Sequence, residues 1–347
     1  MRLINWCELS NIHIVFFIAL YYMSSNCADS PSSFILGMTG DVMLGRLVNE
    51  KIQQTHTKYV WGDLLPLLHS TNINLINLET TLTRSTKRVP KVFNFKSDPK
   101  HVSVLKEASI DIVSLANNHI KDFNNQGLEE TINVLNNADI LHIGAGSNID
   151  EARKPVITHK KGIKIGFIGA TDNEPEWRAT AQNPGVNYFT VDDTQQLESD
   201  IRRLKVQVDI VIVSVHWGPN MRERPTKPYI DAAHRFIEAG ADIIHGHSAH
   251  IFQGIEIYNK SLILYDTGDF IDDYRIDQVL RNDQSFFFKV FLNKKGVEKL
   301  ELIPVIINNM QVNNASNKEA ATILEKMRTL SRAFGTTIDS AGFIRVQ

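Results

Sequence analysis

The sequence has little cysteine and almost no net charge. Two of its 347 residues are cysteines, Cys7 and Cys27, and both stand near the start of the chain. The rest offers no thiolate and no disulfide, so any metal must be held by histidine, aspartate, glutamate or asparagine. With 37 basic and 39 acidic residues the net charge is −2. A broad nucleic-acid-binding face is therefore not expected, although a local anion pocket is compatible with this balance.

The first 29 residues differ from the rest of the chain. Arg2 precedes the apolar run IHIVFFIALYYM, and small and polar residues follow it. This run has the length of a signal-peptide core and is shorter than the roughly 20 residues that a membrane span needs. We expect a cleaved export signal; an uncleaved anchor, with Tyr21 and Tyr22 at the membrane interface, and lipidation at Cys27 are the alternatives. The domain over residues 30–347 would then be secreted or extracytoplasmic, and anchored to a membrane if the segment is retained.

From residue 34 onward, short apolar runs alternate with amphipathic stretches, which is typical of repeated β–α units. The runs are rich in valine and isoleucine without alternation, which indicates strands covered on both faces. They lie at residues 34–45, 72–79, 110–119, 140–146, 164–173, 208–218 and 241–250. Helices are expected at residues 99–108, 126–136, 193–206, 227–239 and 318–332.

The pattern changes after residue 250. Two hairpins are expected there, with turns at Asn259–Lys260 and near Lys295–Gly296, and a last short strand at residues 343–346. No internal repeat or low-complexity stretch divides the chain. One α/β domain of two packed sheets flanked by helices is the simplest interpretation.

Metal-capable side chains follow five of the predicted strands. They are Asp41 after FILGMTG, Asn77 and Glu79 after NINLI, Asn117, Asn118 and His119 after IDIVSLA, His216 after VDIVIVSV, and His247 and His250 after ADII. In open α/β sheets the ligand site lies at the carboxyl ends of the strands. The five ends are therefore expected to gather these residues in one crevice, and the set is more specific than any of its members.

Carboxylate, carboxamide and imidazole together suit divalent zinc, manganese or iron. A carboxylate between two ions can bridge them, and Glu79 is the candidate. Two ions about 3.5–4 Å apart clamp an oxyanion and activate a water for in-line attack. His119, next to the candidate ligand Asn118, is the natural acid for the leaving group.

Each residue also has a simpler interpretation when taken alone. Asp41 after a glycine can cap a turn, Asn117 and Asn118 are good turn residues, and His216 can be a buried, hydrogen-bonded histidine. Three histidines in six residues, His245, His247 and His250, are harder to explain in this way, although Gly246 leaves the register open and His245 can be structural. Asp172, Asn173, Asp266 and Asp269 also follow apolar runs and are expected to line the pocket or orient ligands. Arg46 and Arg222 are candidates to bind an anionic substrate bidentately, with a solvated surface role as the alternative.

At these residues the sequence resembles a known family. The motifs GDVMLGR, NLE, ANNH, HWG and GHSAH, with QGIEIY behind them, match the CapA family in order and spacing from about residue 34 to 275. That family is named for poly-γ-glutamate capsule synthesis and belongs to the calcineurin-like metallophosphoesterase superfamily. The resemblance implies a four-layer α/β/β/α sandwich with the metal site where the strand ends of two sheets meet. It also implies that Asp41 holds the first metal, Glu79 bridges, Asn118 and His216 face the second metal beside the acid His119, and His247 and His250 complete the shell.

The sequence departs at four positions from the patterns common in the wider superfamily or in the family. Met43 stands where a metal-binding histidine is usual, Ser248 and Ala249 replace the His-Pro of a common GHHPH motif, and Asp269 replaces a common Asn. A metal-dependent hydrolase of a phosphate ester or a related anionic polymer linkage is the first functional hypothesis, and the second metal position is the weaker one. The alternative is a non-catalytic export or assembly factor that binds an anionic polymer within a membrane biosynthesis complex. A pseudoenzyme is the third hypothesis, because of Met43.

Overall fold

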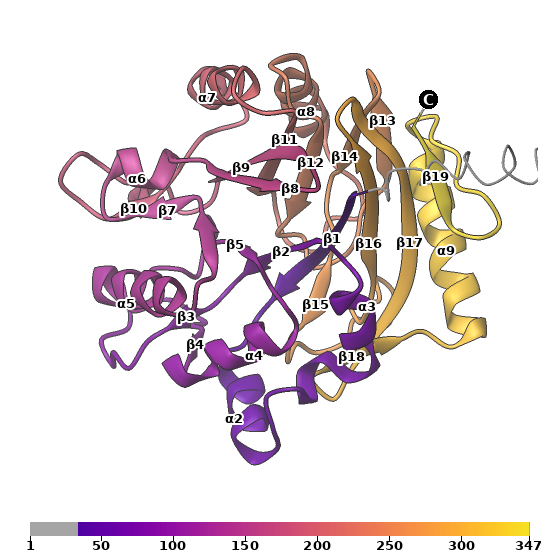
Figure 1. Ribbon diagram of the computed structural model, residues 1–347. Coiled ribbons are helices and arrows are strands. Elements are labelled where there is room, and N and C mark those ends of the chain that lie inside the picture. Colours follow the sequence, from indigo (N-terminus) through magenta and orange to yellow (C-terminus); the bar gives the residue numbers. More distant parts are fainter. Residues whose placement is uncertain (1–33, 347) are drawn as a thin grey trace, which may run out of the picture. The chain divides into compact units, whose positions relative to one another are not determined.

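Two β-sheets lie face to face, and helices cover their outer sides (Figure 1). The structure, a computed structural model, describes residues 34–346, so the predicted leader at residues 1–29 lies outside the described residues. In residues 34–346 no helix has the length and apolar character needed to cross a membrane.

The first sheet has the order β18-β17-β16-β1-β2-β5-β6, with β15 beside β1 and β19 beside β17. Its strands are β1 (Phe34–Val42), β2 (Ile73–Leu78), β5 (Ile112–Ser114), β6 (Leu141–Ile143), β15 (Asp269–Ile271), β16 (Gln284–Asn293), β17 (Gly296–Asn308), β18 (Gln311–Asn314) and β19 (Phe343–Arg345). Strands β1, β2, β5 and β6 run parallel, so their carboxyl ends meet at one edge.

The second sheet has the order β13-β14-β12-β11-β9-β8. Its strands are β8 (Val156–Lys160), β9 (Ile163–Thr171), β11 (Ile210–His216), β12 (Ile243–His247), β13 (Ile255–Tyr258) and β14 (Ser261–Leu264). Two small sheets pair β7 (Ala145–Gly146) with β10 (Gly185–Val186), and β3 (Thr81–Leu82) with β4 (Lys96–Ser97).

Three clusters of buried hydrophobic side chains account for the layers. Leu75, Ile212 and Phe288 belong to the cluster between the two sheets. A second cluster packs the other face of the first sheet, and a third packs the outer face of the second sheet. The helices over the first sheet are α2 (Arg46–Gln54), α3 (Leu65–His69), α4 (Val102–Glu107) and α5 (Asn124–Asn137); those over the second are α7 (Gln195–Lys205) and α8 (Lys227–Glu238). The α/β/β/α sandwich predicted from the sequence is confirmed.

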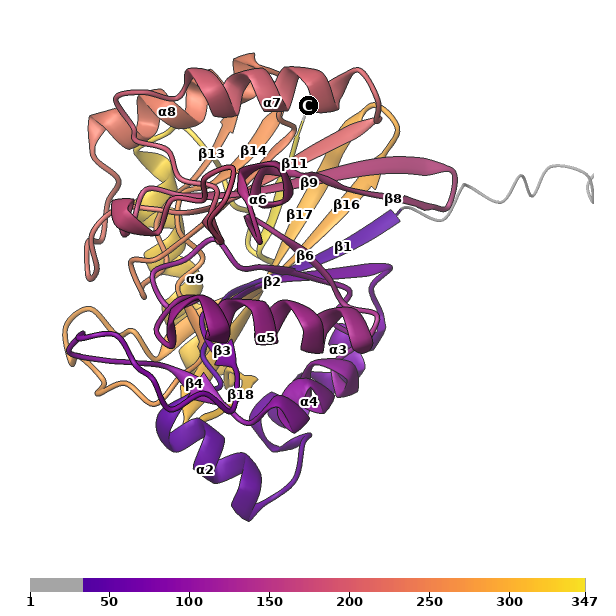
Figure 2. The same cartoon turned by 90° about the vertical axis from the view of Figure 1, so that its left-hand side faces the viewer.

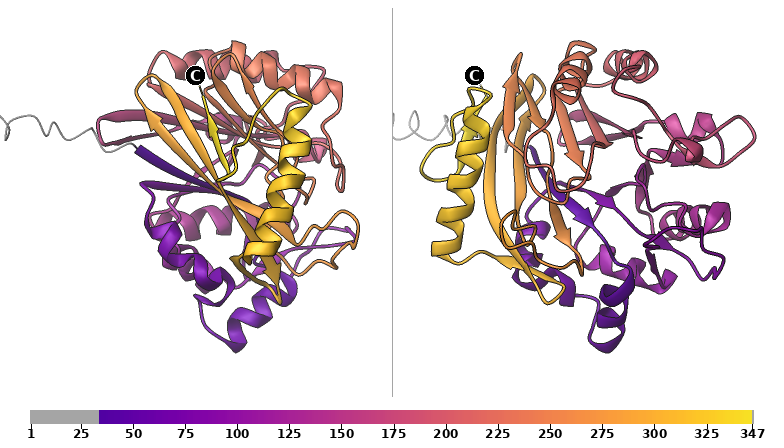
Figure 3. Two further views of the ribbon diagram at one scale, coloured as in Figure 1. Left: turned by 90° about the vertical axis from the view of Figure 1, so that its right-hand side faces the viewer. Right: turned by 180° about the vertical axis from the view of Figure 1, so that it is seen from behind.

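The last helix closes the side of the sandwich. Helix α9 (Asn317–Arg332) runs along β17 (Figure 3) and contributes Ile323, Met327 and Leu330 to the cluster between the sheets. Its start is fixed by a capping box between Ser316 and Glu319.

Most predicted elements are present. The predicted hairpin turn at Asn259–Lys260 joins β13 to β14, and both residues have the positive φ (49° and 66°) that such a two-residue turn requires. Three short helices were not predicted: α2, α3 and α6 (Ile149–Arg153). Helix α2 buries only Val48 and Ile52, too few apolar positions for a clear helical period.

Candidate metal centre

The strand ends of both sheets meet at Asp41, near the end of β1. In the first sheet Asp41 pairs with Asn77 on β2 and with Asp269 on β15. In the second sheet His216 and His247 are the last residues of neighbouring strands and pair with each other. The predicted convergence of strand ends thus involves strands from two different sheets.

The two sheets are tied together just behind this point. His245 Nε2 lies 2.7 Å from the backbone oxygen of Thr39, and its Nδ1 lies 3.0 Å from Ser214 Oγ. His245 is fully buried, and burial lowers its pKa to about 4, so it is neutral and has a structural role between β1 and β12.

Glycines allow the backbones to approach here. A Cβ on Gly40 would lie 1.8 Å from the backbone oxygen of Gly268, and one on Gly246 would lie 2.1 Å from that of Tyr265. The glycines before Asp41 and His247 are therefore required by packing between strands.

Two groups of ligand atoms share Asp41. The ligand atoms of Asp41, His216 and His247 all lie within 4.8 Å of one another, and so do those of Asp41, Glu79 and His250. Asn118 joins the first group, because its Oδ1 lies 3.0 Å from His216 Nε2. All six predicted ligands are therefore brought together, as two adjoining sets.

The residue common to both sets is Asp41, whereas the resemblance gave the bridging role to Glu79. Glu79 Oε1 lies 3.9 Å from His216 Nε2 and 3.7 Å from His119 Nε2, so this carboxylate also reaches both sets. The bridging role of Glu79 stays a prediction.

Four acidic oxygens of the site accept no hydrogen bond from residues 34–346, and the nearest imidazole nitrogen to Asp41 Oδ2 is His250 Nδ1 at 3.4 Å. Asp41 Oδ2, both carboxylate oxygens of Glu79, and Asp269 Oδ2 are buried and accept no hydrogen bond within the described residues. Leaving a buried polar group unpaired costs about 1–3 kcal/mol, and more when it is charged. Divalent cations would satisfy these oxygens, and the donor set of carboxylate, carboxamide and imidazole fits zinc, manganese or iron.

Burial and the crowding of charged groups shift the pKa values of the proposed ligands. Burial, with repulsion from Asp41, raises the pKa of Glu79 well above its ordinary value. Burial lowers the pKa of His216 to about 3, which keeps its imidazole neutral and able to bind a metal. Burial would also lower the pKa of His250, but the carboxylates of Asp269 and Glu79 raise it well above the ordinary value.

Several surrounding groups orient the predicted ligands. Asn77 Nδ2 donates to Asp41 Oδ1 at 2.7 Å, and Asn117 Nδ2 donates to Asn77 Oδ1 at 3.0 Å. Asp269 Oδ1 lies 2.9 Å from His250 Nδ1, and Asp266 accepts from the backbone of Ala249 and Gly268. Asp269 therefore contacts the proposed ligand His250, as expected for an orienting group, whereas Asp266 holds the backbone of the residues that precede His250 and Asp269.

Asp172 supports the loop after β11. Its carboxylate accepts from the backbone of Gly218 and from the hydroxyl of Tyr229. Asp172 stands one residue beyond the end of β9, and its expected role in lining the pocket or orienting ligands stays a prediction.

His119 lies between a carboxylate and an aromatic ring. Its Nδ1 is 2.6 Å from Asp122 Oδ2, and its ring stacks on Phe95 with centroids 3.7 Å apart. Burial and the charge of Lys91 lower the pKa of His119, while burial raises that of Asp122 to about 7. The contact with Asp122 orients the ring so that His119 Nε2 lies 3.7 Å from Glu79 Oε1.

Asp122, Lys91 and Phe95 were missed in the sequence. Asp122 stands three residues after His119, a spacing that brings two side chains together within a single turn. Lys91 Nζ contacts the backbone oxygen of Asn118 and lies 3.1 Å from Glu174 and 3.3 Å from Asp122. Lys91 and Phe95 come from a long loop without any periodic pattern.

The two predicted substrate-binding arginines differ. Arg46 lies beside the site, about 5.0 Å from the ring of Phe95, but its guanidinium pairs with Asp273. An anion would have to compete with that carboxylate. Arg222 is exposed, and its backbone oxygen accepts from Gln253. Neither role is tested by these contacts, and both stay predictions.

Met43 does not replace the missing histidine as a metal ligand. It is fully buried in the cluster beneath the first sheet, and its Sδ lies 3.1 Å from the backbone nitrogen of Gly45. The site consequently has one imidazole fewer than the wider superfamily pattern.

Comparison with known proteins gives the family. The family model described as bacterial capsule synthesis protein PGA_cap matches residues 35–274. A probable polyglutamine synthesis accessory protein of Mycobacterium tuberculosis is 32% identical over 322 residues, which cover 86% of this chain and 84% of that protein. The PGA biosynthesis protein CapA of Bacillus subtilis is 29% identical over 308 residues, covering 86% and 80%.

Among solved structures, a 5'-nucleotidase precursor from Thermus thermophilus aligns with a TM-score of 0.46 and 11% identity, over 87% of this chain and 59% of that one. The extent of the family match and the similarity to the mycobacterial relative decide the assignment. The chain belongs to the bacterial capsule synthesis protein PGA_cap family, as its resemblance to the CapA family predicted.

Proposed function

We propose that this protein is a metal-dependent hydrolase that cleaves a phosphate ester or a related linkage of an anionic polymer during capsule or polyglutamate synthesis. The observation that carries the proposal is the set of buried, unpaired oxygens on Asp41 and Glu79 beside three imidazoles. A protein has no structural reason to keep such oxygens together without a cation.

The residues that would hold two divalent ions are Asp41, Glu79, Asn118, His216, His247 and His250. When bound, such ions polarise the ester oxygens and lower the pKa of a coordinated water. His119 would deliver a proton from Nε2 to the leaving group. Asp122, in contact with His119 Nδ1, would orient the ring, and its carboxylate would balance the positive charge of the protonated imidazole. Lys91 would add positive charge beside Asn118 for an anionic substrate.

The test is metal content together with hydrolysis of phosphomonoester and phosphodiester substrates by the full chain. Glu79→Gln removes one unpaired carboxylate with little change of shape. Asp200→Asn is the matched control, because Asp200 is a buried carboxylate of α7 that pairs with Arg153 outside the site. We expect near two equivalents of metal and turnover in the wild type and in Asp200→Asn, and loss of both in Glu79→Gln. Equal metal-dependent turnover in all three proteins would refute the proposed site.

A second candidate is a non-catalytic assembly factor that binds an anionic polymer within a membrane biosynthesis complex. Met43 favours it, because the missing imidazole leaves one metal position with fewer ligands. Polymer binding that survives chelation, with no ester hydrolysis, would support this candidate. Absence of polymer binding would exclude it.

A further inference from the structure

Exposed hydrophobic side chains concentrate around the mouth of the metal centre. Eight large hydrophobic side chains are exposed in residues 34–346, and five of them lie on α2 and on two loops beside the site. These five are Leu47, Val92, Phe93, Ile276 and Val279. We call residues 84–95 and 272–283 the mouth loops.

Both mouth loops touch the metal centre. Phe95, at the end of the first, stacks on His119, and Tyr274 in the second lies with its ring 4.9 Å from that of His250. Arg46 connects the two loops, because its guanidinium lies 5.1 Å from the ring of Phe93 and 5.4 Å from that of Tyr274. Both loops project from the same side of the molecule, on the left of Figure 2, beyond the carboxyl end of β1.

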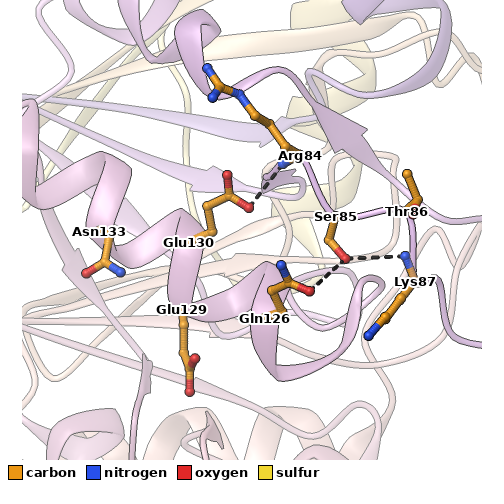
Figure 4. A pocket seen from close by; sticks show the side chains of 8 residues that line it. All are labelled: Arg84, Ser85, Thr86, Lys87, Gln126, Glu129, Glu130 and Asn133. Carbon is orange, nitrogen blue, oxygen red and sulfur yellow. Dashed lines mark hydrogen bonds between the residues drawn. The ribbon is translucent and has the colours of Figure 1, made fainter.

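The first mouth loop has a fixed base. Its residues Arg84 to Lys87 face side chains of α5 (Figure 4), and the hollow between them has a volume of about 630 Å³. The backbone nitrogen of Arg84 donates to Glu130, Ser85 Oγ donates to Gln126, and Asn124 donates to the backbone oxygen of Lys87. The exposure of Val92 (90%) and Phe93 (56%) therefore belongs to a loop that is held in place at its base.

The outward charge of the first mouth loop is positive, and that of the second is balanced. The first contains four basic residues and no acidic one, and Lys87 and Arg88 are exposed. The second contains four acidic and two basic residues: Asp272 is buried, Asp273 pairs with Arg46 and Asp283 pairs with Arg281. Asp277 accepts from backbone nitrogens, and its carboxylate faces solvent. Arg275 of the same loop is exposed.

We propose that the two mouth loops dock on an anionic lipid surface. Val92, Phe93, Ile276 and Val279 would enter the interfacial region of the bilayer, and Lys87, Arg88 and Arg275 would meet the headgroup phosphates. Apolar side chains next to Lys and Arg are the combination that holds peripheral proteins at such an interface. A second copy of the chain is a poorer partner, because a two-fold contact would bring the positive first mouth loops of both copies against each other.

This docking orients the metal centre toward the membrane. A substrate carried on a lipid, or extruded through the bilayer, would then reach the site without release into solution. The inference rests on the surface alone and does not depend on whether the site hydrolyses esters.

The test uses the full chain with Cys7→Ser and Cys27→Ser, so that one introduced cysteine carries an environment-sensitive fluorophore. The label positions are Val92→Cys and Val279→Cys, and Val206→Cys is the control because Val206 is equally exposed (86%) at the end of α7. Vesicles contain phosphatidylcholine with or without phosphatidylglycerol, and acyl-chain spin labels serve as quenchers. Any binding through the leader is common to all three proteins.

With anionic vesicles we expect labels 92 and 279 to shift to the blue and to be quenched by the spin labels, while label 206 stays unchanged. Lys87→Glu with Arg88→Glu should lower the apparent affinity for anionic vesicles, read at position 92, about 30-fold, from roughly 1 kcal/mol lost per basic residue near the surface. Equal quenching at all three positions, or none at 92 and 279, would overturn the proposal. Protection of labels 92 and 279 from aqueous iodide without vesicles would also overturn it, because a protein surface would then cover the loops.

Discussion

Replacing Glu79 by glutamine should stabilise the metal-free protein and destabilise the metal-loaded one. Glu79 is fully buried, and neither of its carboxylate oxygens has a partner within the described residues. Burial and repulsion from Asp41 and Asp269 both disfavour its charge. The glutamine amide removes the charge and places N–H donors beside Asp41, whose ligand oxygen lies within 4.8 Å of that of Glu79.

The size of the effect follows from these contacts. An unpaired buried group costs about 1–3 kcal/mol, so metal-free Glu79→Gln should be more stable than the wild type by about that amount. A cation at 1,000 times its dissociation constant stabilises the wild type by about 4 kcal/mol. The variant loses most of this gain, so the wild type should become the more stable protein by about 1–3 kcal/mol.

Urea unfolding in EDTA and in excess manganese measures both states. Asp200→Asn serves as the control: it breaks the ion pair with Arg153 and should lower stability equally in the two conditions. If Glu79→Gln is less stable than the wild type in EDTA, the unpaired carboxylate is not a strained metal ligand, and the reasoning fails.

Three further predictions concern other parts of the chain. Gly40→Ala should lower the free energy of unfolding by about 3 kcal/mol in urea titrations. The new Cβ would lie 1.8 Å from the Gly268 backbone oxygen, which cannot move like a side chain. An unchanged midpoint of urea unfolding would contradict the close approach of β1 and β15. Asp122→Asn should lower kcat about 10–100-fold with little change in KM or metal content. The variant leaves the metal ligands intact but loses the carboxylate that orients His119. An unchanged kcat would remove His119 from the mechanism. Burial lowers the pKa of His101, so the neutral side chain contributes fully to folding stability above the ordinary pKa of about 6.5, and this contribution is lost as the pH falls below that value. The free energy of unfolding of the wild type relative to His101→Gln should therefore decrease from pH 7 to pH 5. A constant difference would contradict this prediction.

The strand ends of the site were predictable from the sequence because two signals coincide there. A buried parallel strand gives an unbroken apolar run, and Asp41, His216 and His247 each stand at the end of one. The carboxyl ends of such strands gather at one edge, so their convergence followed without knowledge of the strand order.

The surroundings of the site were not predictable in the same way. Lys91 and Phe95 belong to the loop that joins β3 to β4, and this loop contacts Asn118 and His119. Tyr274 lies in a segment more than 150 residues beyond His119. Loop side chains carry no period, so only the tertiary fold brings them to the site. The position of Asp41 in both ligand sets could not be predicted from the sequence either, because it depends on how the two sheets meet.

Anomalous diffraction from crystals grown with manganese is the most direct test of the central claim. We expect two anomalous peaks about 3.5–4 Å apart, one against Asp41, His216 and His247 and the other against Asp41, Glu79 and His250. A single peak would restrict the site to one metal and favour the role of Met43 as a lost ligand position. No peak at Asp41 would contradict the metal centre itself.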